Sequence, residues 1–114
     1  MVKITKYLAY TLLIFFFTYK AHSIESAAHK VEVSKCFGIL MTIHNNSFDD
    51  INRIKAKKIL NLYLDKIIRL NIGSLMMKEM SESGAKSIYL DVINTNTEKV
   101  NKSIQKCINI FKVG

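Results

Sequence analysis

The stretch from Thr95 to Phe111, TNTEKVNKSIQKCINIF, decides the fold that we expect for this chain. Its apolar side chains recur at spacings of three and four residues, which place them on one stripe of an α-helix. The stripe consists of Val100, Ile104, Cys107, Ile108 and Phe111. Thr95 and Glu98 match the capping-box pattern that opens many helices. The sequence therefore predicts a C-terminal helix that buries Cys107.

The same periodicity predicts a helix over about residues 25–44, which carries the other cysteine on its apolar face. That face consists of Val33, Cys36, Phe37, Leu40 and Met41. Gly38 lies inside the pattern, where a glycine either weakens a helix or marks a close approach to another helix. We expect Asn45-Asn46 to end this helix.

A second helix should follow, because Ser47 and Asp50 form another capping-box pattern and Asn71-Ile72-Gly73 provides an end signal. Its predicted apolar face consists of Ala56, Ile59, Leu60, Tyr63, Leu64, Ile67 and Ile68. Two short helices are expected next, over residues 75–81 and from about residue 85 to residue 92, with a break at Ser83-Gly84.

These elements predict an all-α fold, a small bundle of four or five helices. Cys36 and Cys107 are the two cysteines of the chain, and each lies on the apolar face of a predicted helix. Two cysteines in a small exported domain more often form a disulfide than remain free thiols. We therefore expect one disulfide that joins the first and last helices.

The N-terminal residues have the pattern of a secretory signal peptide. Lys3 and Lys6 precede an apolar run over residues 7–19, and Ala21-His22-Ser23 offers small residues at a cleavage point. An uncleaved membrane anchor is the alternative, but a span needs about 20 apolar residues and this run has about 13. We expect residues 1–23 to be a signal peptide, cleaved after Ser23, and residues 24–114 to form the helical domain. The protein would then be periplasmic or secreted.

Cleavage of the signal peptide would lower the net charge of the protein. The 114 residues carry 17 Lys and Arg against 9 Asp and Glu, a formal net charge of +8. Three of the basic residues lie in the leader and none of the acidic ones does, so residues 24–114 carry +5. An exported protein without aromatic residues interleaved among its basic ones is not expected to bind nucleic acid.

No catalytic or metal-binding set is recognisable, and we expect no cofactor. His29 and His44 lie 15 residues apart in one predicted helix, so they do not share a metal. Asp49-Asp50 begins a helix, where acidic side chains complement the helix dipole. No serine lies in a nucleophile motif. A small hydrolase is therefore the least favoured class.

Two groups of residues are candidates for binding a partner. Arg53, Lys55, Lys57 and Lys58 form the densest basic cluster, which is either a solvated face or a docking surface for an acidic partner. Met76, Met77 and Met80 form an adaptable apolar group, which either fills the core or forms a partner or dimer surface. From these groups we predict Arg53, Lys55, Lys58, Met76, Met77 and Met80 as partner-binding residues.

The first cysteine lies in Val31-Glu32-Val33-Ser34-Lys35-Cys36-Phe37 and the second in Lys106-Cys107-Ile108, close to the C-terminus. An exported helical chain of this size, with its cysteines so placed, resembles the periplasmic immunity proteins that neutralise amidase effectors of type VI secretion systems. The resemblance implies a homodimer that plugs the active-site cleft of a peptidoglycan amidase. It identifies no inhibitory contact residues. Our leading hypothesis is a non-enzymatic, exported binding protein of this kind. The alternative is a secreted effector or a helical protein that binds membrane surfaces.

Overall fold

The computed structural model describes residues 27–113, and the signal peptide expected over residues 1–23 lies outside them. The described part contains four helices and no strand. These are the N-terminal helix over residues 27–46, α2 (Asp50–Arg69), α3 (Ser74–Ile93) and α4 (Thr97–Lys112). The expectation of a small all-α bundle with one disulfide is confirmed.

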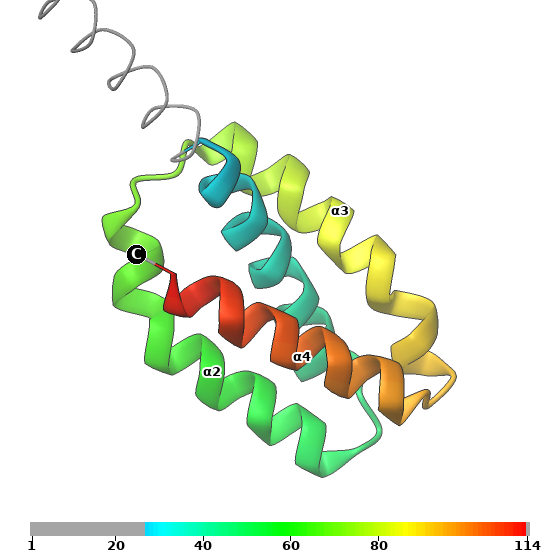
Figure 1. Ribbon diagram of the computed structural model, residues 1–114. Helices are drawn as coiled ribbons and strands as arrows, with labels where there is room; N and C mark the ends of the chain where they lie inside the picture. The colour runs from blue at the N-terminus through cyan, green and yellow to red at the C-terminus, as the bar shows by residue number, and fades with distance from the viewer. Residues whose placement is uncertain (1–26, 114) are drawn as a thin grey trace, which may run out of the picture.

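The N-terminal helix and α4 form the inner pair of the bundle, and α2 and α3 are its outer helices. In Figure 1, α2 and α3 lie on opposite sides of the inner pair, and α4 packs against both of them. One continuous core joins all four helices: Val33, Cys36, Leu40, Ile43, Ala56, Ile59, Leu60, Ile67, Ile88, Val92, Val100, Ile104, Cys107 and Phe111. Each outer helix consequently keeps a broad face that no other described helix covers.

The disulfide joins the two inner helices. Cys36 and Cys107 are bonded across a sequence separation of 71 residues, with their Cα atoms 5.4 Å apart. Both side chains are buried in the core. The pairing expected from the sequence is confirmed.

The end of α2 is tied to the end of α4. Tyr63 stacks on Phe111 with ring centroids 5.1 Å apart, and Lys66 Nζ donates a hydrogen bond to the backbone carbonyl of Phe111. A cation at the carbonyl end of a helix satisfies an acceptor that lacks a partner within the helix, and it complements the helix dipole. These contacts fix α2 by the face opposite to its solvent-exposed side.

The expected break at Ser83-Gly84 is wrong, because α3 is one helix of 20 residues that passes through both positions. Gly84 is buried in the middle of α3. Where a glycine lies against another backbone, the lack of a Cβ is required for packing, and the helix continues through it.

Gly38 and Gly84 allow the N-terminal helix and α3 to touch backbone to backbone. A Cβ added at Gly38 would lie 2.7 Å from the Cα of Ser81, and one added at Gly84 would lie 3.0 Å from the Cα of Lys35. Each glycine thus packs against the residue three positions before the other glycine, at the point where the two helices cross. The two helices run in the same direction (Figure 1). The possibility that Gly38 marks a close helix approach is therefore confirmed.

Both expected capping boxes are wrong, by two residues for α2 and by one residue for α4. The N-cap of α2 is Asp49, whose Oδ1 accepts a hydrogen bond from the backbone N–H of Ile51 at 3.0 Å. The N-cap of α4 is Asn96, and Thr95 lies before the helix with a φ of 55°. In both cases a neighbouring residue supplies the cap position, because the turn geometry fixes where the helix begins. The expected end of α2 is confirmed by Asn71, whose φ of 50° leaves the helical region.

The apolar face expected for α2 is partly wrong. Leu64 and Ile68 are exposed, whereas Ala56, Ile59, Leu60 and Ile67 are buried. An outer helix meets its neighbours over only part of its circumference, so a broad apolar stripe is buried only along its centre. The remaining apolar side chains face solvent.

We predict that Gly38→Ala and Gly84→Ala each lower the free energy of unfolding by about 1–3 kcal/mol, because the new methyl group must push two backbones apart. Urea denaturation measures this free energy. Gly73→Ala is the matched control: a Cβ at Gly73 meets nothing within 4 Å, so the change should be below about 1 kcal/mol. A gain in stability at Gly38 or Gly84, as expected for an uncrowded helical glycine, would contradict the contact.

We also predict that the Cys36→Ser/Cys107→Ser variant is less stable than the oxidised protein by about 4 kcal/mol, from the entropy of closing a loop of this length. Reduction of the wild-type protein should cause a similar loss. Urea denaturation with and without a thiol reductant measures both effects. Equal midpoints for the oxidised and reduced protein would show that the disulfide does not constrain the fold.

Candidate interaction surfaces

The acidic pair at the start of α2 has a structural role in this fold. Asp49 caps the helix, and Asp50 forms an ion pair with Arg53 at 2.5 Å. Across residues 27–113, no three His, Cys, Asp or Glu side chains are grouped so that they would hold a metal ion. The two carboxylates therefore stabilise the first turn of α2.

The histidines lie far apart. His29 and His44 are near opposite ends of the N-terminal helix, a separation of about 22 Å for 15 residues. Both are half-buried, and His29 Nε2 and His44 Nδ1 have no hydrogen-bond partner among the described residues. Their positions at the helix ends match the prediction from the sequence, although neither is fully exposed.

The predicted basic cluster lies on the exposed side of α2. Arg53, Lys55, Lys57 and Lys58 are all exposed. Arg53 is paired with Asp50, whereas no carboxylate of the described part lies within ion-pair distance of the three lysines. The cluster is therefore a net positive surface.

The exposed side of α2 also carries large apolar side chains, which our sequence analysis did not identify as a surface. Ile51 and Leu62 are 76% and 73% exposed. Further exposed apolar residues on or beside this helix are Phe48, Ile54, Leu64 and Ile68. We call this combination of basic and apolar residues, over residues 48–69, the α2 face.

The outer side of α3 is a second surface with exposed apolar side chains, which lie near its two ends. Leu75 and Leu90 are 69% and 66% exposed, and Tyr89 and Ile93 are also exposed. A shallow hollow of about 240 Å³ lies on this surface, lined by Ala85, Lys86, Tyr89 and Leu90. We call the surface around this hollow, from Leu75 to Ile93, the α3 face.

The predicted methionines divide between core and surface. All three are half-buried, and of the three Met77 packs against the hydrophobic core. They lie in the first half of α3, and the basic cluster lies in the first half of α2, toward the other end of the bundle (Figure 1). The fold therefore does not bring the two predicted groups of partner-binding residues together.

Helix α4 provides the contrast to both outer helices. None of its exposed residues is a large hydrophobic one. Its exposed side carries an ion pair between Lys102 and Glu98 at 3.5 Å and is otherwise polar. The outward side of α4 therefore has the composition of an ordinary solvated surface.

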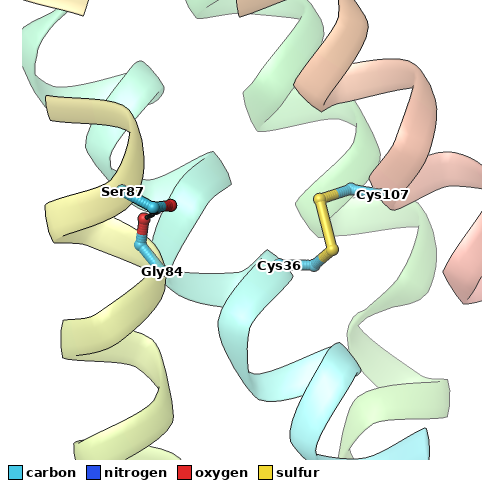
Figure 2. The surroundings of a disulfide bond; sticks show 4 residues. All are labelled: Cys36, Gly84, Ser87 and Cys107. Atoms are coloured by element: carbon cyan, nitrogen blue, oxygen red, sulfur yellow. Dashed lines mark hydrogen bonds between the residues drawn. A yellow bond between two sulfur atoms is a disulfide. The ribbon is translucent and has the colours of Figure 1, made fainter. Parts of the chain in front are cut away.

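A second hollow, of about 310 Å³, lies beside the disulfide between the N-terminal helix, α3 and α4. Figure 2 shows Gly84 and Ser87 across from Cys36 and Cys107; Ser87 Oγ donates a hydrogen bond to the carbonyl of Gly84 at 2.6 Å. Of the lining residues only Cys36 and Gly84 are buried. The hollow is thus a surface depression with no enclosed polar group.

Comparison of the chain with protein-family models, with curated proteins and with solved structures finds no match. None of the helices that the structure describes is both long enough and apolar enough to cross a membrane. A disulfide such as Cys36–Cys107 forms and persists in an oxidising compartment. The exposed surfaces of this chain are therefore the features that bear on its function.

Proposed function

We propose that this protein is an exported, non-enzymatic binding protein that recognises a protein partner through the α3 face. The supporting observation is that Tyr89, Leu90 and Ile93 are exposed together near the end of α3, on the side that no other described helix covers. Exposed apolar patches with a polar rim are typical of interaction sites. Exposed charges of both signs near them, Glu79, Glu82 and Lys86, form such a rim.

The composition of the α3 face favours a protein as the partner. Protein interfaces are enriched in aromatic residues and methionine, and this helix exposes Tyr89 and partly exposes Met76 and Met80. The hollow beside Tyr89 and Leu90 has room for a side chain of the partner. A pocket that receives an anchoring side chain is a common centre of binding energy.

A peptidoglycan amidase toxin is the most concrete partner. The resemblance of the chain to type VI amidase immunity proteins, in its size, helical pattern and cysteine positions, implies this target. The disulfide adds support, because an oxidising envelope compartment is where an enzyme that cleaves peptidoglycan acts. Inhibition would be by occlusion, with α3 entering the active-site cleft and excluding the substrate.

We predict that the protein, co-expressed in the periplasm with an amidase encoded beside its gene, prevents lysis and co-purifies with that enzyme. Leu90→Glu should weaken binding by about tenfold or more and restore lysis, because it places a charge in the apolar centre of the contact. Gln105→Glu on α4 is the matched control and should protect as well as the wild-type protein. Undiminished lysis with the wild-type protein, or full protection by Leu90→Glu, would contradict the proposal.

A second copy of this chain is the competing occupant of the α3 face. The positions of Glu82 and Lys86 would make this face complementary to itself in a dimer. Leu75, Glu79, Glu82, Lys86, Tyr89 and Ile93 follow one another at spacings of four and three residues, so they lie along one line of α3. If two copies align antiparallel about Gly84, Glu82 lies opposite Lys86 of the second copy, and Leu75 lies opposite Ile93. Such a contact is the same on both copies, as a two-fold dimer requires.

For this homodimer we predict that Glu82→Lys and Lys86→Glu each shift the protein toward the monomer, because each places like charges opposite one another, and that the double exchange restores the dimer. Sedimentation velocity measures the mass. Exchange of Glu98 and Lys102 on α4 is the matched control and should leave the mass unchanged. A monomeric wild-type protein would exclude the dimer and leave the α3 face free for the amidase.

A further inference from the structure

We propose that the α2 face is a docking surface for anionic phospholipid bilayers. The inference is independent of the proposed function, which rests on the α3 face at the other side of the bundle. One row of α2 carries both kinds of side chain that such a surface needs. The row consists of Ile51, Lys55, Lys58 and Leu62, which are spaced by four, three and four residues and so lie along one line of the helix. All four side chains are exposed.

The charges of this surface are complementary to a layer of lipid phosphates. Exposed basic residues on α2 are Arg53, Lys55, Lys57, Lys58 and Arg69, against the exposed acids Asp50 and Asp65. Asp50 is occupied by Arg53, which leaves Lys55, Lys57 and Lys58 as neighbouring cations. Basic residues held close to an anionic leaflet each add to binding, and salt weakens the attraction.

The apolar residues provide the second part of the contact. A helix that lies in the plane of a membrane surface buries its aliphatic side chains at the boundary between headgroups and acyl chains, while lysines reach the phosphates. Ile51, Ile54 and Leu62 are more than half exposed among these lysines. Phe48, directly before the helix, is 76% exposed and extends the apolar part of the surface.

The residue types favour a bilayer over a protein partner at this surface. Lysine is depleted in protein interfaces, whereas aromatic residues, methionine and arginine are enriched. Lysine and aliphatic residues predominate on the α2 face. The helix is also held firmly from behind by its buried residues and by the contacts of Tyr63 and Lys66 with Phe111, so the surface is presented as one rigid unit.

The test is co-sedimentation of the exported, oxidised protein with two kinds of vesicle. One contains phosphatidylethanolamine with about one third phosphatidylglycerol, and the other contains phosphatidylcholine alone. We expect binding to the anionic vesicles at about 0.15 M salt, at least about tenfold stronger than to the neutral ones, and weaker at about 0.5 M salt. No binding to the anionic vesicles, or equal binding to both kinds, would overturn the proposal.

Two pairs of variants localise the contact. Lys55→Glu/Lys58→Glu should reduce partitioning by more than about tenfold, whereas Lys99→Glu/Lys102→Glu on α4, with the same spacing and the same change in net charge, should reduce it far less. Ile51→Ser/Leu62→Ser should also reduce partitioning by about tenfold or more, and Leu75→Ser/Leu90→Ser on α3 should not. All eight positions are exposed, and circular dichroism confirms that each variant is folded.

The other possible occupants give different results. Equal losses of vesicle binding in the α2 and α4 charge variants would show that the attraction depends on net charge alone. Persistent vesicle binding of the α2 variants would place the contact in another segment. Either result overturns the proposal. A second copy on the α2 face would appear as a change in sedimenting mass in the α2 variants without any vesicle binding, which also overturns it. Loss of vesicle binding in the α2 variants, with amidase inhibition intact, would support this inference separately from the proposed function.

Discussion

The disulfide between Cys36 and Cys107 determines which helices are inside this bundle. With their Cα atoms 5.4 Å apart, the N-terminal helix and α4 form the inner pair, and α2 and α3 occupy the flanks (Figure 1). The close contacts of Gly38 with Ser81 and of Gly84 with Lys35 then bring α3 against the N-terminal helix at backbone distance. An outer helix covered on one side only has a face left for binding, so this one covalent constraint is also the origin of both candidate surfaces.

The two outer helices have different surface chemistry, and this difference supports two separate partners. The α3 face carries Tyr89, Leu90 and charges of both signs, which suits a protein with a matching rim. The α2 face carries unpaired lysines between isoleucine and leucine side chains, which suits an anionic layer. A protein with both surfaces would inhibit its target while held at the membrane, close to the peptidoglycan that an amidase attacks.

The sequence predicted the inner helices well and the outer ones less well, for a physical reason. In α4, nearly all large apolar residues lie on one side, so spacing alone identified Val100, Ile104, Cys107 and Phe111 as core. In α2 and α3, apolar residues lie on both sides, and periodicity does not indicate which side meets the core; Leu64 and Ile68 were therefore misassigned. Gly84 was misjudged because a glycine that ends a helix and a glycine that admits a neighbouring backbone look alike until the neighbour is placed. Neither face could be predicted for the same reason, because Ile51 and Leu90 are recognised as exposed only once the fold shows that no other described helix covers them.

The central claim is that this fold works by binding and occluding a partner enzyme in an oxidising compartment. Titration of a purified peptidoglycan amidase, encoded beside the gene, with the oxidised protein tests the claim most directly, with release of cleaved peptidoglycan as the measurement. The account predicts that hydrolysis falls linearly with added protein and ends when each amidase molecule is complexed. Hydrolysis that continues at an unchanged rate in the presence of excess protein would contradict it.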